Sequence, residues 1–183
     1  MSGRIRNEAF KNKVMSAHDA AALVENGWNI GFSGFTGSGY PKAFPEALGA
    51  IIDAAHNRGE EFKIGVWTGA STAPELDGAL ARTGGISYRA PYQSDPDMRN
   101  AINAGTSYYQ DIHLSHMGPQ VSQGFLGKLH VAVIEATAIL ENGDVIPSSS
   151  VGMNRTYLEN ADKIIIEVNE WQSEGLFGMH DIY

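Results

Sequence analysis

The segment 28–42 constrains the fold of this chain more than any other part of the sequence. A short apolar run at 28–32 enters a loop at 34–39 that contains three glycines, and a helical pattern begins after Pro41. A strand that opens through glycines onto a helix leaves backbone N–H groups and the positive end of the helix dipole facing the same space. The segment therefore predicts a strand–loop–helix unit that holds an anionic group, such as a phosphate, carboxylate or thioester oxygen.

Apolar runs alternate with helical patterns along the rest of the chain. This alternation predicts an α/β fold, with an open, mostly parallel sheet and flanking helices, in one domain that spans residues 1–183. The near-continuous β-branched run at 128–136 is typical of a parallel strand covered on both faces. Further strands are expected at 62–67, 87–89, 111–114, 145–147 and 163–168, and helices at 16–24, from Pro41 to about 58, and at 74–80, 96–104 and 155–160.

Three loops of small residues, 34–39, 68–72 and 148–152, each follow a candidate strand. Ligands of open α/β sheets bind beyond the carboxyl ends of the strands. If the three strands are neighbours in the sheet, we expect the loops to line one crevice.

The local motifs do not match the common nucleotide-binding patterns. The loop at 34–39 has neither the G-K-[ST] ending of a phosphate-binding loop nor the order of a dinucleotide fingerprint, so a turn that only packs a strand on a helix stays open. Ser71 lies in a sequence that departs from a nucleophile elbow, because Ala73 replaces the final glycine. Ser71 is therefore a helix N-cap, a hydroxyl donor to a ligand, or a nucleophile whose base the sequence does not identify.

Composition excludes several classes of function. A net charge of -8 argues against nonspecific nucleic-acid binding, and the absence of Cys excludes disulfides and a thiolate nucleophile. His113 and His116 have no companion carboxylate at zinc-site spacing, so no metal is expected. No apolar stretch is long enough to span a bilayer, and the N-terminus does not resemble a signal peptide. We expect a cytoplasmic protein, or a mitochondrial one in a eukaryote.

Taken together, the motifs make the sequence similar to the acetyl-CoA hydrolase/transferase family, and most of all to its succinyl-CoA:acetate CoA-transferase group of class I CoA-transferases. The resemblance covers nearly the whole chain. The segments that carry it are 4–7, 33–42, 68–72, 98–105, 133–139, 149–152, 164–172 and 180–182.

The resemblance implies a CoA-transferase fold, related to that of sugar-phosphate isomerases, of which this chain forms the first of two related halves. It implies transfer of CoA between an acyl-CoA and a small carboxylate, through a glutamyl-CoA thioester formed in the second half. Neither Glu135 nor Glu167 matches that catalytic glutamate, so no catalytic residue is expected here and the isolated chain is expected to be inactive. The apolar ending at 175–183 also favours a part of something longer. Coenzyme A is then a substrate rather than a permanent cofactor, and the expected partners are the missing C-terminal half and further copies of the chain.

The resemblance also implies which residues bind the substrate. The acyl group passes through a mixed anhydride whose oxygens need N–H and hydroxyl donors. Ser94 stands where close relatives have threonine, which keeps the hydroxyl. The implied binding residues are Gly34, Phe35, Thr36, Gly37, Ser38, Gly39, Thr68, Gly69, Ser71 and Ser94.

Three other functions stay open. An acyl-CoA hydrolase would differ from a transferase only in the access of water to the intermediate. An enzyme like a sugar-phosphate isomerase would need a base and a phosphate grip in this chain, and no convincing set is visible. A ligand-binding module would bind CoA or carboxylates without turnover.

Overall fold

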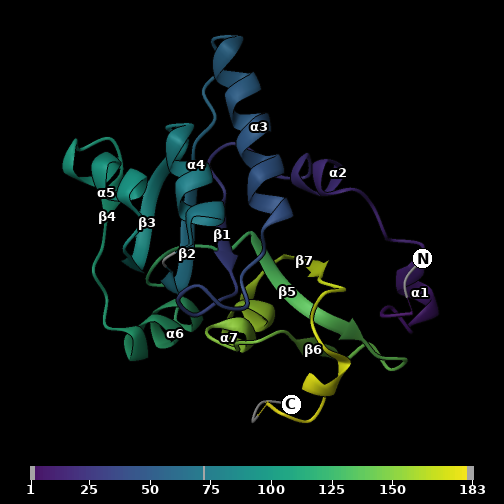
Figure 1. Cartoon of the computed structure of the whole chain (residues 1–183). Coiled ribbons are helices and arrows are strands. Elements are labelled where there is room, and N and C mark those ends of the chain that lie inside the picture. Colours follow the sequence, from purple (N-terminus) through teal and green to yellow (C-terminus); the bar gives the residue numbers. More distant parts are fainter. Residues whose placement is uncertain (1–2, 72, 181–183) are drawn as a thin grey trace.

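A computed structural model describes residues 3–71 and 73–180 and has the predicted α/β architecture, with one central sheet (Figure 1). The strands lie side by side in the order β4-β3-β2-β1-β5, and β7 pairs with the other edge of β5. All these pairs are parallel, and β6 pairs with β5 in the antiparallel sense. The strands are β1 (Asn29–Phe32), β2 (Ile64–Ser71), β3 (Ile86–Gln93), β4 (Tyr108–Tyr109), β5 (Val131–Ile139), β6 (Val145–Pro147) and β7 (Lys163–Val168).

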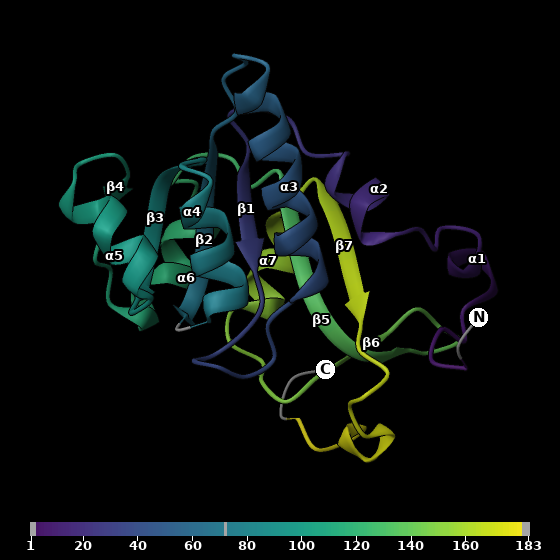
Figure 2. The same ribbon diagram turned by 45° about the horizontal axis from the view of Figure 1, so that its top comes forward.

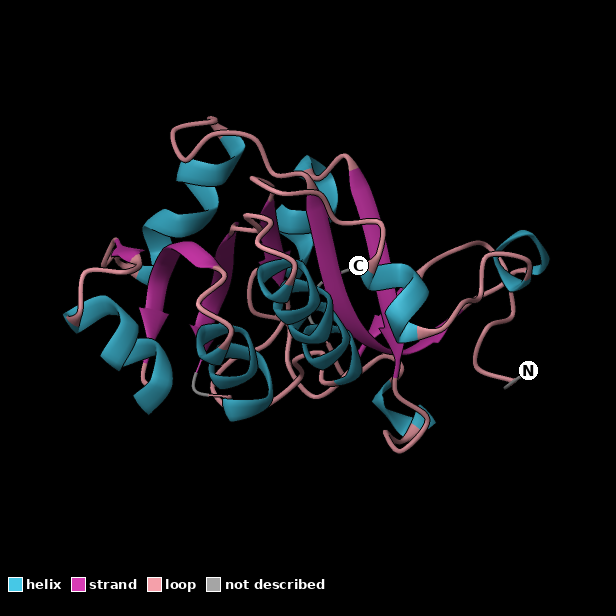
Figure 3. Ribbon diagram, turned by 90° about the horizontal axis from the view of Figure 1, so that it is seen from above, coloured by secondary structure: helices cyan, strands magenta, loops and turns pink. Residues whose placement is uncertain are grey.

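Helices cover both faces of the sheet (Figures 2 and 3). Side chains of α2, α3, η1, α4 and α5 share one apolar cluster with β1 and β2, and side chains of α6 and α7 share a second cluster with β5. The helices are α1 (Glu8–Lys11), α2 (Ala17–Ala21), α3 (Ala43–Asn57), η1 (Pro74–Gly78), α4 (Ala79–Arg82), α5 (Pro96–Asn103), α6 (Leu114–Ser122), α7 (Asn154–Asn160) and η2 (Glu174–Leu176).

The strand order reverses at β1, which lies between β2 and β5. The chain leaves β1 through α3 on one face and reaches β5 after α6 on the opposite face. Loops that leave two such strands diverge, and this divergence opens the usual ligand position of α/β sheets. The segment after β1 is the glycine loop, defined here as residues 34–39.

Two of the sequence predictions are wrong in this part of the fold. The predicted strand at 111–114 does not form, because Leu114 begins helix α6, which His113 caps by accepting a hydrogen bond from the Ser115 amide. The predicted loop at 68–72 is strand up to Ser71, since β2 continues between its two neighbours with all eight residues buried; Thr72 lies outside the described residues. Other predictions are confirmed, including the limits of β7 and the capping of α2 by Ser16.

Candidate functional site

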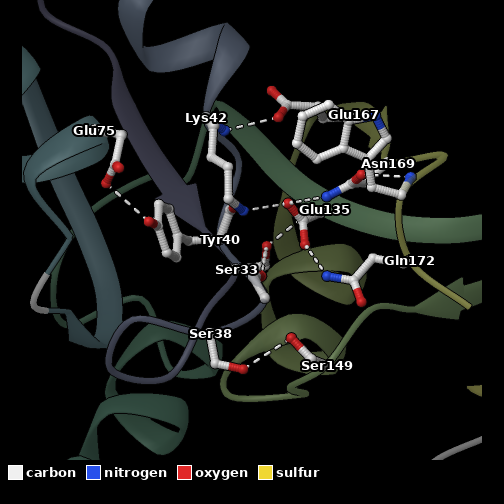
Figure 4. A network of polar contacts seen from close by, with 12 residues as sticks. Ser33, Ser38, Tyr40, Lys42, Glu75, Glu135, Ser149, Glu167, Asn169 and Gln172 are labelled. Carbon is white, nitrogen blue, oxygen red and sulfur yellow. Dashed lines mark hydrogen bonds and ion pairs between the residues drawn. The ribbon is translucent and has the colours of Figure 1, made fainter.

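The glycine loop lies against the two other segments that the sequence analysis placed beside it. The Thr36 amide donates to the carbonyl of Ala70 in β2 at 2.5 Å. On the other side, the Ser38 hydroxyl is 2.8 Å from that of Ser149, and the Ser150 hydroxyl donates to the Ser38 carbonyl at 2.8 Å (Figure 4). The three segments therefore meet, packed directly against one another.

Two glycines make this packing possible. Gly39 has φ +68°, and a Cβ at this position would lie 2.2 Å from Ser150 Oγ. Gly34 has φ +121°, and its Cβ would lie 2.8 Å from Tyr40 Cβ. A side chain at either position meets both backbone strain and a steric clash. Gly34 and Gly39 thus allow the loop to pack closely against Tyr40 and Ser150.

The amides of Phe35, Thr36 and Ser38 in the glycine loop are already hydrogen-bonded inside the protein. The Phe35 amide donates to the Ser38 carbonyl at 2.9 Å, the Ser38 amide donates back at 3.2 Å, and Thr36 is bonded to β2. Gly37 stands at the exposed tip, and no protein atom lies within 4 Å of a Cβ built there. The sequence predicted several free N–H donors in this loop. Among the described residues, the amides of Gly34, Gly37 and Gly39 have no backbone acceptor, and of these three residues Gly37 is exposed.

The N-terminus of α3 is also occupied, and this corrects a second part of the predicted anion site. The carboxylate of Glu167, in β7, accepts hydrogen bonds from the amides of Lys42, Ala43 and Phe44 at 2.7, 3.2 and 2.8 Å. These are the amides that a helix leaves without intrahelical partners, and a carboxylate there also complements the dipole. A residue of the protein thus holds the position that the sequence analysis assigned to a ligand.

Glu135 forms the centre of a buried polar network next to the loop (Figure 4). Its carboxylate, with a side-chain exposure of 0%, is 2.6 Å from the Lys42 ammonium and accepts a hydrogen bond from Asn169 at 3.3 Å. The Ser33 hydroxyl accepts from the Glu135 amide and donates to the Gly39 carbonyl, both at 2.8 Å. The network therefore fixes both ends of the glycine loop to β5.

Lys42 and Tyr40 extend the network towards η1. The Lys42 ammonium donates to the Tyr40 carbonyl at 2.7 Å and lies 4.1 Å from the centre of the Tyr40 ring. The Tyr40 hydroxyl donates to Glu75 at 2.8 Å. Burial, followed by the hydrogen bond to the Glu75 carboxylate, raises the pKa of Tyr40 to about 12. Tyr40 is therefore a neutral hydrogen-bond donor at physiological pH.

Ser71 ends β2 with its hydroxyl uncommitted. The residue is 5% exposed, and its Oγ has no hydrogen-bond partner in residues 3–71 and 73–180. Ser94 is adjacent, because its amide donates to the Ser71 carbonyl at 3.2 Å. Gln93 pairs in register with Ser71, and its buried Oε1 is likewise without a partner in the described part of the chain. Unsatisfied buried polar atoms are uncommon in folded proteins, so each one calls for an explanation.

Thr68 is committed to a different network. Its hydroxyl accepts a hydrogen bond from Arg89 at 2.8 Å, and Arg89 forms an ion pair with Asp77 at 2.8 Å in which both side chains are fully buried. Gly69 follows inside the same strand, where a Cβ would lie 2.8 Å from the Gly34 carbonyl oxygen. Of the residues predicted in β2, Ser71 alone has an uncommitted hydroxyl, whereas Thr68 and Gly69 support the structure around it.

The network of Lys42, Glu135, Glu75 and Gln172, together with Gln93, lies outside the predicted binding residues. Glu135 and Glu167 were considered in the sequence only to exclude them as the catalytic glutamate, and no sequence pattern gave a signal for the pairing of Glu135 with Lys42. Among the described residues, no group of three His, Cys, Asp or Glu side chains is arranged to hold a metal ion. No helix in the same residues is long and apolar enough to cross a membrane.

Sequence comparison finds relatives over the whole chain. The family model for the acetyl-CoA hydrolase/transferase N-terminal domain matches residues 1–183. The succinyl-CoA:acetate CoA-transferase of Clostridium kluyveri is 48% identical over 180 residues, which are 98% of this chain and 33% of that protein. The acetyl-CoA hydrolase of Saccharomyces cerevisiae is 37% identical over 186 residues, which are 98% of this chain and 35% of that protein. The chain thus spans about a third of the length of these relatives.

Structure comparison finds the same fold in more distant proteins. RipA from Yersinia pestis aligns with a TM-score of 0.69 and 16% identity over 89% of this chain and 38% of its own. Glutaconate coenzyme A-transferase from Acidaminococcus fermentans aligns with a TM-score of 0.59 and 15% identity over 85% of this chain and 68% of its own. At these identities the likeness establishes the fold alone.

Proposed function

The chain belongs to the acetyl-CoA hydrolase/transferase family, and we propose that it supplies one wall of the acyl-CoA site of a longer CoA-transferase. In the proposed reaction, CoA leaves an acyl-CoA such as acetyl-CoA or succinyl-CoA and is transferred to a small carboxylate. A glutamate outside residues 1–183 attacks the acyl-CoA and expels CoA thiolate to give a mixed anhydride, and the thiolate then attacks the glutamyl carbonyl to give a glutamyl-CoA thioester and release the first carboxylate. The acceptor carboxylate attacks this thioester to form a second anhydride, and the freed CoA thiolate attacks its acyl carbon, which gives the new acyl-CoA and restores the glutamate. Coenzyme A is a substrate throughout.

The uncommitted hydroxyl of Ser71 carries the proposal. It lies at the carboxyl end of a central strand, next to Ser94 and the glycine loop. An anhydride or a thioester intermediate has carbonyl oxygens that need donors as charge develops on them. Ser71 and Ser94 are the hydroxyl donors of this wall, with the exposed amide of Gly37 beside them, and Thr68 and Arg89 keep β2 in position.

The two carboxylates near the loop are poor candidates for the nucleophile. Glu135 is buried and paired with Lys42, and Glu167 is held by three backbone amides. A carboxylate nucleophile must reach the thioester carbon, and neither group is free to do so. We therefore infer that the 183-residue chain alone does not turn over acyl-CoA.

The test uses a chimera of this chain with the remaining two thirds of the C. kluyveri transferase. CoA transfer from succinyl-CoA to acetate is measured for the chimera, for its Ser71→Ala variant and for a Ser122→Ala control, since Ser122 is exposed at the end of α6. We expect Ser71→Ala to lower kcat/KM by about 100- to 1,000-fold, the scale of one lost donor to a developing charge, with no change for the control. A folded, active chimera that tolerates Ser71→Ala would contradict the assignment, and transfer by the isolated chain would contradict the need for a second part.

Hydrolysis is the second candidate, favoured by the similarity to the yeast acetyl-CoA hydrolase. The two functions differ in whether a carboxylate takes CoA from the glutamyl-CoA thioester or water hydrolyses that thioester and frees CoA. Release of free CoA from acetyl-CoA in the absence of any added carboxylate would assign hydrolysis. Strict dependence of turnover on added acetate or succinate would assign transfer.

A further inference from the structure

An apolar groove runs along the outer edge of β7, away from the glycine loop. Its volume is about 730 Å³. One wall is β7, and the opposite wall is the N-terminal arm, defined here as residues 8–16. Val14 and Met15 of the arm and Ile164 of β7 line the groove with exposures of 52%, 50% and 51%.

The arm is anchored at both ends but covers little of the protein. Before it, Ile5 bridges to Ile139 at the end of β5, where the Arg6 amide donates to the Ile139 carbonyl at 2.8 Å. After it, α2 packs Ala20 and Ala21 into the core. Between these anchors, α1 buries none of its residues, and Figure 2 shows the arm standing away from β7. The arm thus closes a slot around the groove.

Within residues 3–71 and 73–180, the outer edge of β7 has a regular set of backbone groups without partners. Lys163 donates to the His130 carbonyl at 3.0 Å, and Asn169 donates to Ala136 at 2.8 Å, so the odd-numbered residues face β5. In a parallel strand the alternate residues point to the other side. The amides and carbonyls of Ile164, Ile166 and Val168 therefore face the groove, and the described residues offer no strand to pair with them.

The groove is apolar above and below the plane of the sheet. Ala20, Leu23 and Phe44 line it on the α3 face, and Leu158 and Ile166 line it on the α7 face. A strand placed there would be covered on both faces, as internal strands of parallel sheets are. Free edges of this kind are also the sites at which proteins accept an added strand.

We propose that the groove receives one extended, apolar segment from the part of the longer protein outside residues 1–183, which pairs with β7 as an additional strand. This proposal rests on the proposed function, in which the chain is part of a longer protein. It also rests on the length of the relatives, because the chain spans only 33% and 35% of two of them. A second copy of the chain fits less well. Its own β7 lies behind the same arm, so two β7 edges meet only if both arms are displaced.

Amide exchange tests the proposal with an internal control. In the chimera, the amides of Ile164, Ile166 and Val168 should exchange at least tenfold more slowly than in the 183-residue chain. The amides of Ile165 and Glu167, which face β5, should be slow in both. Equal and fast exchange of the three outer amides in both proteins would overturn the proposal. Slow exchange in the free chain that depends on its concentration would assign the groove to a second copy.

A matched pair of variants locates the effect. Met15→Lys places a charge in the groove, and Tyr108→Lys places one on β4, at the opposite edge of the sheet, where Tyr108 is 83% exposed. Both should leave the unfolding midpoint of the free chain unchanged, and Met15→Lys alone should restore fast exchange in the chimera. CoA transfer is measured on the same samples. Protected outer amides without CoA transfer would support strand pairing in the groove and contradict the proposed function. CoA transfer without protected amides would support the proposed function and contradict strand pairing.

Discussion

The ion pair between Lys42 and Glu135 is unequally buried, and this asymmetry predicts unequal costs for removing its two members. The Glu135 side chain has an exposure of 0%, whereas that of Lys42 is 42%. Lys42→Met leaves a buried carboxylate with two long hydrogen bonds, from Asn169 at 3.3 Å and Gln172 at 3.5 Å. Removing one partner of a buried pair costs about 3–5 kcal/mol, a large part of the stability of a domain.

The reverse change should cost less. Glu135→Gln keeps the shape and one acceptor oxygen, and the Lys42 ammonium keeps the Tyr40 carbonyl at 2.7 Å and reaches water. What is lost is the charge assistance of one hydrogen bond, so we expect about 1–2 kcal/mol. The double variant should be less destabilised than the sum of the two single changes, because no buried carboxylate remains to be stranded.

Urea unfolding followed by far-UV circular dichroism measures these differences, provided that the m-value is the same in all variants. Amide exchange in the glycine loop should rise in Lys42→Met, because the pair joins that loop to β5. If Glu135→Gln is as costly as Lys42→Met, or costlier, burial of the carboxylate does not govern the pair and the reasoning fails.

Three further outcomes follow from the same geometry. Gly39→Ala should destabilise the fold by about 2 kcal/mol or more, because residue 39 has a positive φ and the new Cβ would clash with the Ser150 hydroxyl. Gly37→Ala should change the stability by no more than about 0.5 kcal/mol. Thermal unfolding compares the two variants, and equal costs would contradict the packing role of Gly39. Because the folded-state pKa of Tyr40 is raised from 10.0 to about 12, its stabilisation is complete below pH 10 and is lost as the pH rises towards 12. A Tyr40→Phe variant should show a weaker alkaline loss of the urea midpoint, and an unchanged loss would exclude this cause. Thr68→Val should cost about 1–3 kcal/mol, because the buried Arg89 guanidinium loses one of its acceptors, whereas Ser71→Ala should be nearly neutral for stability. A urea series in which Ser71→Ala is the costlier change would contradict the supporting role of Thr68.

The sheet could be predicted because its strands are marked by unbroken apolar runs. The run at 163–168 coincides with β7, and the run at 128–136 overlaps β5 (Val131–Ile139). Helix α6 was missed because Gly118 and Pro119 lie in its middle and lower its propensity, although Leu114, Met117 and Val121 carry the spacing of a buried face. The sheet could thus be predicted from local sequence patterns. Helix α6 could not, because it forms through packing that overrides its low helix propensity.

The site was predictable only in part, because its contacts join distant segments. The sequence indicated that three small-residue segments would meet, and they do. It did not indicate that Lys42 and Glu135, 93 positions apart, would pair. It also placed Thr68 to Ser71 in a loop, since small residues are common in loops. Here they form strand because β2 continues, buried, between β1 and β3. Such choices depend on tertiary packing, which no local pattern records.

The cap that Glu167 places on α3 has a consequence for the order in which parts of the chain fold. The Lys42 amide and its acceptor are 125 positions apart, so this contact closes a very long loop. Contacts of that range form late, because the entropy of the intervening chain must be lost first. During synthesis, α3 emerges from the ribosome long before β7 and starts without its carboxylate. The first turn of α3 therefore lacks its cap until β7 has been made, so truncation just before Glu167 should leave the amides of Lys42, Ala43 and Phe44 without their acceptor.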